Sequence, residues 1–323
     1  MKLIGKIALA LAALIVLGAV AGWVALRRPD IPYATLEQQY AVPTSRYADI
    51  PGGFRAHYRD DGPADAPVVL LVHGFGDSFL SWAGWIDVLS KDFRVITLDL
   101  PGHGLTRAPA DFAPSSEAQV KFVGDLAAAL NLKSYAIAGS SMGGGVAWRT
   151  TLAYPESVWG LVLVDAAGWP NAARGEPPLA FKLLGTPVGR FLLETIETRP
   201  ITSESLKANF VDKSIVTPAF VDRWVAVQRA PGHRPILMKS LGAATSNATP
   251  EAVGAIRAPT LVLWGDKDVL LDVASAQKFA DAIPGAKLIV YPDVGHLPQL
   301  EIPARSAADA AAFLKAARAP ATP

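Results

Sequence analysis

The sequence predicts an α/β fold, in which helices flank a mostly parallel central sheet. Three observations lead to this expectation. Segments typical of strands and of helices alternate over most of the 323 residues. Residues 68–72 are apolar without interruption, which is typical of a strand buried on both faces. Gly139-Ser140-Ser141-Met142-Gly143 joins a strand-like segment to a helix-like one, as expected at a tight strand-to-helix turn.

The first 28 residues form a unit of their own. No charged residue interrupts the stretch 7–26, which two lysines precede and two arginines follow. As a helix, this stretch would rise about 30 Å, the thickness of a bilayer's hydrocarbon core. Its length favours an uncleaved membrane anchor that contacts lipid through residues 7–26, and Trp23 would lie near the interface.

Two other interpretations of this segment remain open. Ala19-Val20-Ala21 offers a small-residue cleavage site, so residues 1–21 could be a signal peptide, and the mature protein would then be secreted. A buried helix of a soluble protein is the third interpretation. Lysine and arginine are balanced on the two sides and specify the orientation poorly. With the short N-terminus inside, the body of the protein would be exported to the periplasm.

The remaining elements follow in order after a proline-rich and polar linker, 29–45. Pro51-Gly52-Gly53 separates the first two strands and indicates a hairpin. The stretches expected as strands are 46–50, 54–60, 68–72, 94–98, 135–138, 158–164, 260–264 and 287–291. Helices are expected at 82–89, 117–130, 142–153, 273–283 and 303–316, the second of them because apolar residues recur near helical spacing.

Residues 171–255 break this alternation and predict a helical cap inserted into an α/β core of residues 46–170 and 256–318. An insertion after a central strand would lie over the C-terminal edge of the sheet, where open α/β sheets bind ligands. The cap is rich in large apolar side chains. Most of them are expected to pack the cap onto the core. Others could line a tunnel for an acyl chain, and Trp224 is the candidate for substrate contact.

Composition excludes several classes of site and partner. The net charge is +1 and no long basic block occurs, so no nucleic-acid partner is expected. The chain has no cysteine, which removes disulfides, thiolate metal sites and a thiol nucleophile. We expect no metal and no cofactor, because no metal-ligand spacing and no dinucleotide-binding glycine motif is present. The sequence leaves the oligomeric state open.

Ser141 at the centre of the G-x-S-x-G motif is the candidate nucleophile. A serine hydroxyl needs a base to accept its proton, and the base needs a carboxylate to orient it. Among the five histidines, His296 follows the last strand and is the histidine that comes after every candidate acid. Asp268 is the expected acid. Asp266 and Asp165 remain alternatives, because each also follows a strand.

The negative oxygen that forms when serine attacks a carbonyl requires preorganised N–H donors. We expect one donor to be the backbone N–H of Met142, at the start of the helix. The second is expected from Phe75, in the glycine-containing loop that follows strand 68–72, and the Phe75 ring would line the pocket. His73 at the start of this loop is expected to have a structural role rather than a catalytic one.

Five motifs in this order resemble the α/β-hydrolase superfamily over about residues 46–318. They are His73-Gly74-Phe75-Gly76, Asp99-Leu100-Pro101-Gly102-His103-Gly104, Gly139-Ser140-Ser141-Met142-Gly143, Gly265-Asp266-Lys267-Asp268 and Gly295-His296. In that family the acid usually lies three residues after the glycine, which again favours Asp268. The combination of anchor, linker and helical cap resembles membrane-anchored bacterial esterases and phospholipases and the monoacylglycerol-lipase-like members.

The resemblance implies a serine hydrolase that cleaves carboxylic esters of small molecules or lipids through an acyl-enzyme, without a cofactor. Serine at the centre of the motif differs from the aspartate of haloalkane dehalogenases and epoxide hydrolases. C–C bond hydrolases and cofactor-free perhydrolases use the same triad and remain alternatives. A non-catalytic ligand-binding member of the fold is the alternative of another class. Acyl length, head group and physiological substrate do not follow from the sequence.

Overall fold

A single sheet organises the described part of the chain, which in this computed structural model comprises residues 2–170, 182–183, 185–243 and 247–318. Eight strands are hydrogen-bonded in the order β1-β2-β4-β3-β5-β6-β7-β8 among these residues. Their bounds are β1 Ser45–Ile50, β2 Phe54–Asp61, β3 Val68–Val72, β4 Arg94–Leu98, β5 Tyr135–Ser140, β6 Val158–Val164, β7 Thr260–Gly265 and β8 Lys287–Tyr291. The β1–β2 and β2–β4 pairs are antiparallel and the other pairs are parallel, which confirms the predicted mostly parallel sheet.

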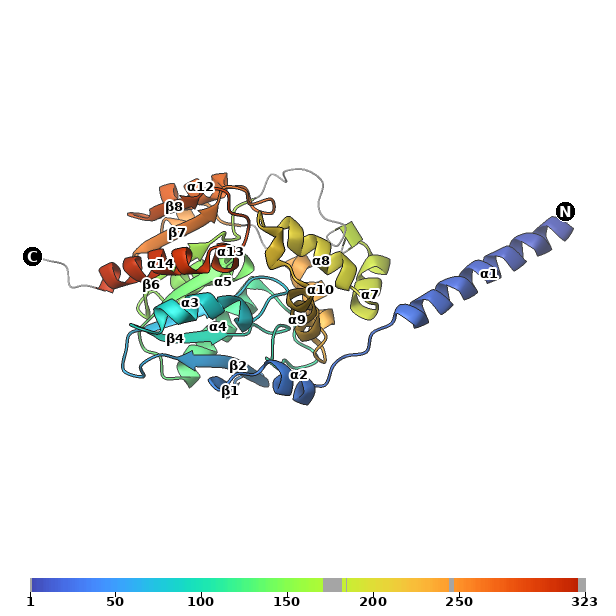
Figure 1. The fold of residues 1–323 in the computed structure, drawn as a ribbon, viewed down its shortest axis with the longest axis horizontal. Coiled ribbons are helices and arrows are strands. Elements are labelled where there is room, and N and C mark those ends of the chain that lie inside the picture. The colour runs from blue at the N-terminus through green and yellow to red at the C-terminus, as the bar shows by residue number, and fades with distance from the viewer. Residues whose placement is uncertain (1, 171–181, 184, 244–246, 319–323) are drawn as a thin grey trace, which may run out of the picture.

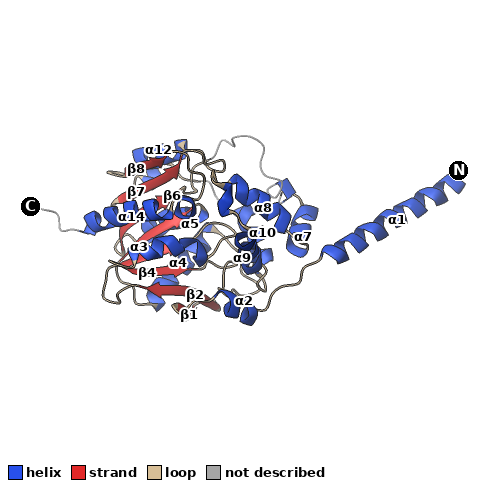
Figure 2. Cartoon of the chain, viewed as in Figure 1, coloured by secondary structure: helices blue, strands red, loops and turns tan. Residues whose placement is uncertain are grey.

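Helices cover both faces of this sheet (Figure 2). One face packs against α3 (Ala83–Leu89) and α14 (Pro303–Arg318), and the other against α4 (Ser116–Ala129), α5 (Met142–Ala153) and α12 (Ala274–Ala282). Side chains of alternate residues in a strand point to opposite faces of the sheet. Leu70 and Val72 belong to the apolar cluster on the α5 side, whereas Val69 and Leu71 belong to the cluster on the α3 side. Short helical segments lie at η1 Phe79–Trp82, α11 Pro250–Val253 and α13 Pro298–Glu301.

The segment 29–45, expected to be a linker, contains a helix that was not predicted from the sequence. This helix, α2, runs over Tyr33–Tyr40 and begins directly after Pro32. Leu36 is fully buried and packs in a cluster with Phe79 and Leu105 of the core. One buried apolar side chain thus holds this short helix against the body.

The predicted cap contains α7 Pro187–Thr195, α8 Arg199–Ala208, η2 Lys213–Ile215, α9 Pro218–Gln228 and α10 His233–Ala243. These helices lie beyond the C-terminal ends of the strands, on the side of the body that is nearest to α1 (Figure 1). Thr217 caps α9, since its hydroxyl accepts a hydrogen bond from the backbone N–H of Phe220 at 3.2 Å. Three apolar residues assigned to the cap, Leu179, Phe181 and Leu184, lie outside the described residues.

The N-terminal helix α1 covers Lys2–Leu26 and extends away from the rest of the molecule (Figure 1). Residues Ile4–Leu26 are long and apolar enough to cross a membrane, and none of this stretch is buried against the body. By length and composition, a membrane anchor and a signal sequence both fit this helix.

Candidate active site

Ser141 occupies a strained turn between β5 and α5. Its backbone has φ 53° and ψ −119°, values that a residue with a side chain adopts only when its surroundings enforce them. Two hydrogen bonds do so: the Ser141 N–H donates to Val164 O at 2.9 Å, and the N–H of Ala167 donates to Ser141 O at 2.9 Å. Both partners belong to the end of β6 and the turn after it, so the neighbouring strand fixes the conformation of the serine.

The glycines around Ser141 are required because neighbouring backbone atoms leave no room for a side chain. A Cβ on Gly139 would lie 2.1 Å from the carbonyl oxygen of Gly143. On Gly143 itself, a Cβ would lie 2.3 Å from the carbonyl oxygens of Val72 and His73. Atoms do not approach this closely, so any larger residue would force α5 away from β5 and β3 and would displace the serine.

His296 and Asp268 form a buried pair in the loops that follow β8 and β7. The imidazole Nδ1 lies 2.7 Å from the Asp268 carboxylate Oδ2, and both residues are at least 94% buried. The other carboxylate oxygen accepts the backbone N–H groups of Leu270 and Leu271 at 2.7 and 2.9 Å. The carboxylate is therefore fixed from both sides, and it directs the proton-accepting Nε2 of His296 away from itself.

Ser141, Asp165, Asp268 and His296 follow the C-terminal ends of β5, β6, β7 and β8 respectively. These four strands are consecutive neighbours in the sheet. Parallel strands that end at one edge deliver their following residues to one place, so the topology gathers side chains that are 155 positions apart between the first and the last.

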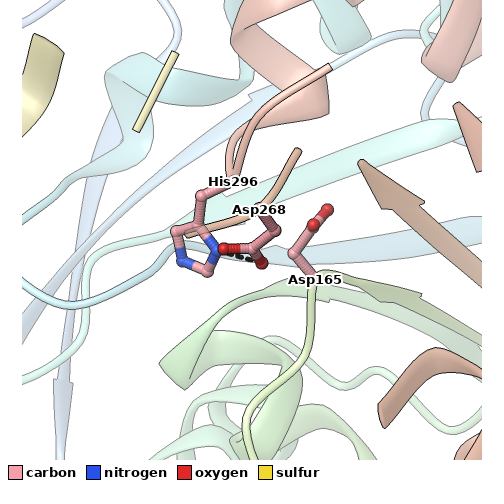
Figure 3. Close-up of side chains that lie close together, drawn as sticks. All are labelled: Asp165, Asp268 and His296. Carbon is pink, nitrogen blue, oxygen red and sulfur yellow. Dashed lines mark hydrogen bonds and ion pairs between the residues drawn. The ribbon is translucent and has the colours of Figure 1, made fainter. Parts of the chain in front are cut away.

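Asp165, an alternative acid in the sequence, joins the same cluster. Its Oδ1 accepts the N–H of Gly265 at 3.1 Å, and the ligand atoms of Asp165, Asp268 and His296 all lie within 4.8 Å of one another. Figure 3 shows the Asp268 side chain between the imidazole and Asp165. Complete burial, together with the charge of Asp268, raises the pKa of Asp165 well above its usual range.

Two carboxylates and an imidazole this close together also raise the question of a metal ion. Four of the atoms that could ligate a cation already form hydrogen bonds: Nδ1 and Oδ2 with each other, Asp268 Oδ1 with two N–H groups, and Asp165 Oδ1 with one. The second oxygen of Asp165 has no partner among the described residues. The donor set fits a hydrogen-bonded proton carrier better than a metal site.

The other acid considered, Asp266, lies apart from this cluster. Its carboxylate pairs with Lys267 at 2.7 Å, and its N–H donates to Tyr291 O at 3.0 Å. It is thus a turn residue at the end of β7.

The loop after β3 passes directly beside Ser141. A Cβ built on Gly74 would lie 3.3 Å from the serine Cβ and 3.9 Å from its Oγ. The side chain of Gln228, on α9, donates to the carbonyl of Gly76 at 2.8 Å and connects this loop to the cap. Of the two expected N–H donors, Phe75 lies on this loop, next to Gly74, and Met142 is the first residue of α5, next to Ser141.

His73 takes the structural position that was expected of it. Its Nδ1 donates to Gly74 O at 2.7 Å, and its Nε2 accepts the N–H of Leu100 at 3.0 Å. Complete burial lowers the pKa of this imidazole. A neutral ring with both nitrogens engaged joins the loop after β3 to the loop after β4.

Two residues of the site had no signal in the sequence. Glu301 accepts the N–H of Gly295 at 2.7 Å through one oxygen and the N–H of Asp212 in the cap at 2.7 Å through the other. Gln299 donates to the buried hydroxyl of Ser140 at 3.0 Å. Both lie on α13, a helix of a single turn. In a single sequence, a helix this short cannot be distinguished from a loop. Together they fasten the loop of His296 to the cap and to the serine turn.

A cavity of about 70 Å³ opens next to Met142. Its lining includes Gln119, Met142, Val146, Arg149 and Ser240. Neither Phe75 nor Trp224 is among its lining residues, although both were expected to contact substrate. The Phe75 ring is half-buried against His103, and the Trp224 ring is 8% exposed and stacks on Phe220 within the cap.

Comparisons with known proteins agree with this geometry. The family model described as the alpha/beta hydrolase fold matches residues 67–303. Among solved structures, a bacterial membrane phospholipase A is similar with a TM-score of 0.75 and 26% identity, over 99% of this chain and 100% of that one. The likeness thus includes the N-terminal helix.

The curated relatives include hydrolases of different substrates. A 2-hydroxy-6-oxononadienedioate hydrolase of Comamonas testosteroni is 29% identical over 77% of this chain and 87% of its own length. A monoacylglycerol lipase of Xenopus laevis is 27% identical over 79% of this chain and 78% of its own length.

Proposed function

This chain belongs to the α/β-hydrolase family, and from that premise we propose that it is a membrane-anchored serine hydrolase of carboxylic esters with apolar acyl chains. The observation that carries the proposal is the 2.7 Å bond between His296 and Asp268 at the sheet edge where the serine turn lies. A buried imidazole held by a carboxyl group is the arrangement that makes a neighbouring serine hydroxyl nucleophilic.

In the proposed mechanism, the Ser141 Oγ attacks the ester carbonyl while His296 Nε2 accepts the serine proton. Asp268 holds the ring in the required tautomer and stabilises the imidazolium that forms. The backbone N–H groups of Met142 and Phe75 donate to the oxygen on which negative charge develops. His296 then protonates the leaving alcohol. Water, deprotonated by His296, releases the acid from Ser141, and no cofactor takes part.

Three features support an apolar acyl group. Helix α1 is suited to hold the enzyme at a bilayer, where long-chain esters reside. The cavity beside Met142 is lined mainly by carbon atoms, and each buried methylene of a ligand contributes about 0.8 kcal/mol. Membrane phospholipase A and monoacylglycerol lipase, named above, act on lipid esters. The same proposal places the catalytic body outside the cytoplasmic membrane.

A C–C bond hydrolase is the second candidate, because relatives with that activity are 29% identical over most of the chain. Such an enzyme would cleave 2-hydroxy-6-oxo dienoates faster than esters. Assaying both substrate classes with one preparation distinguishes the two candidates.

Ser141→Ala is the direct test. The variant is expected to lose about 10⁶-fold in kcat on p-nitrophenyl esters, monoacylglycerols and phospholipids, because no other group forms the acyl-enzyme. The wild type is also expected to react with a fluorophosphonate probe, and the variant to remain unlabelled. Unchanged circular dichroism would show that the fold persists. Ester turnover by the variant at the wild-type level would disprove the proposal.

A further inference from the structure

The C-terminal end of α1 is attached to the cap rather than to the core. The indole Nε1 of Trp23 donates to the Thr195 hydroxyl at 2.9 Å. The Trp23 ring also stacks on Phe191, with ring centroids 5.9 Å apart. Both partners belong to α7, and Figure 1 shows α7 beside the end of α1.

Backbone contacts continue this attachment beyond the helix end. Arg27 forms an antiparallel bridge with Ile196, and the N–H of Glu197 donates to Leu26 O at 2.9 Å. The N–H of Arg28 donates to Thr195 O at 2.9 Å, and its guanidinium pairs with the Glu197 carboxylate at 3.0 Å. Main-chain hydrogen bonds and an ion pair together fix the position of α7 relative to the point at which the chain leaves α1.

Helix α7 turns an apolar face outward. Val188 is 69% exposed and Phe191 is 50% exposed, whereas Gly189 and Leu193 are buried against the cap. Positions 188, 191 and 195 are spaced by three and four residues, so they share one side of the helix. The exposed apolar pair therefore lies on the same side as Thr195, which holds Trp23.

We propose that α7 is a second membrane contact, which lies in the interfacial region of the bilayer beside the anchor, with Val188 and Phe191 directed into lipid. The proposal rests on the anchor of the proposed function. An indole near the end of a spanning helix lies at the level of the lipid head groups. Because α7 is bonded to that indole, it shares its depth. A short amphipathic helix at this depth buries its apolar side in the head-group boundary.

The occupant of this face is accordingly a lipid surface, continuous with the lipid around α1. This geometry holds the cap against the bilayer, so that the cap separates the catalytic edge of the sheet from the membrane (Figure 1). An ester drawn from the bilayer would then meet the cap first.

The absence of cysteine allows a direct test with the full-length protein. Val188→Cys, labelled with the fluorophore NBD, is reconstituted in phosphatidylcholine–phosphatidylglycerol vesicles with and without nitroxide-bearing lipid. Val290→Cys on β8 is the matched control, because Val290 is also an exposed valine but lies on an edge strand of the core. Leu14→Cys, in the middle of α1, reports insertion of the anchor.

The expected result is blue-shifted emission at position 188 and quenching by nitroxide lipid several-fold stronger than at 290. Quenching at 14 but not at 188 would overturn the lipid contact and leave the anchor intact. Quenching at neither position would disprove the anchor and the contact together. A blue shift at 188 that grows with protein density and is insensitive to nitroxide would assign the face to a second copy of the chain. Phe191→Cys is read in the same way, and fluorophosphonate labelling shows that each variant is folded.

Discussion

Two carboxyl groups in contact with each other cannot both be ionised cheaply in a buried site. Asp268 accepts two N–H groups and faces an imidazole. Asp165 accepts one N–H group, its second oxygen has no hydrogen-bond partner among the described residues, and burial raises its pKa. The two carboxyl groups thus differ in their hydrogen-bond partners, although both residues follow strands in the same way.

This difference predicts opposite results for the same substitution. Asp268→Asn should lower kcat about 10⁴-fold, because an amide cannot hold the productive tautomer of His296 or stabilise its charge. Asp165→Asn should retain most of the activity, because the hydrogen bond of Asp165 goes to the Gly265 N–H rather than to His296, and the amide oxygen of asparagine can accept it. Steady-state kinetics on a p-nitrophenyl ester measures both.

A large loss in Asp165→Asn together with a small loss in Asp268→Asn would reverse the assignment. Asp266→Asn is the matched control on the same turn, since its carboxylate pairs with Lys267 and not with the histidine.

At the residue scale, the sequence predicts the residues proposed to carry out the reaction better than the residues that hold them in position. The positions of Ser141 and His296 follow from motifs and chain order. The choice of Asp268 among three aspartates depends on the spacing after Gly265 that the family resemblance implies, and Asp268 is the aspartate bonded to the imidazole in the structure. Glu301 and Gln299 are invisible in one sequence, since their partners are backbone groups and a buried hydroxyl that only the folded chain brings near.

At the scale of elements, close contact between two loops sets the geometry of the pair formed by Asp268 and His296. A Cβ on Gly265, at the end of β7, would lie 2.1 Å from the carbonyl oxygen of Gly295. The N–H of Lys267 donates to Val294 O at 2.9 Å in the same region. The loop that carries Asp268 and the loop that carries His296 are therefore packed backbone to backbone.

Gly265→Ala should separate these loops. We expect a destabilisation of about 1–3 kcal/mol, as for other overpacked sites, and a fall in kcat larger than any change in KM. Gly160→Ala on β6 is the control, because its Cβ would meet other atoms only at 3.5 Å, an ordinary contact distance. Chemical denaturation and ester kinetics compare the two variants. Equal effects would show that the loop contact is not important.

Strand positions were predictable because apolar runs and turn residues mark them locally, and the sheet contains every strand expected. Helix α2 was not, because prolines precede it and its one buried contact, Leu36, is a tertiary effect. Val188 and Phe191 lie in the predicted cap, where most large apolar side chains were expected to pack onto the core, and only the folded position of α7 shows that they face outward.

For the whole molecule, stability should depend on pH through Asp77, which follows the loop beside Ser141. It is 4% exposed, and one oxygen accepts the N–H of Ser78 at 2.7 Å. The other oxygen has no hydrogen-bond partner among the described residues. Burial raises the pKa of Asp77 from 3.8 to about 7.

The direction in which the free energy of unfolding changes with pH follows from the difference between the pKa of Asp77 in the folded and in the unfolded chain. Below pH 4 Asp77 is protonated in both the folded and the unfolded chain. Between pH 4 and 7 the unfolded chain ionises first, so the free energy of unfolding falls as pH rises, by at most about 4 kcal/mol. Asp77→Asn removes this contribution. It should match the wild type near pH 4 and exceed it increasingly up to pH 7.

Urea unfolding of the detergent-solubilised proteins from pH 4 to 8 measures this difference. Asp65→Asn, at an exposed carboxylate, is the control. A difference between Asp77→Asn and the wild type that stays constant with pH would show that Asp77 is already charged in the folded protein.

The contacts of the segment after α1 determine which part of the molecule bears a pulling force on the N-terminus. The N–H of Ile31 donates to Arg229 O at 2.7 Å, the Arg229 guanidinium donates to Pro29 O at 2.8 Å, and Arg234 pairs with Asp30 at 2.6 Å. Both arginines flank the turn from α9 to α10, and the first contact of this segment with the core comes later, at α2. A pulling force on the N-terminus would therefore be borne first by the end of α7, to which Trp23 and Arg28 are bonded, and then by the turn between α9 and α10. The sheet would bear it last.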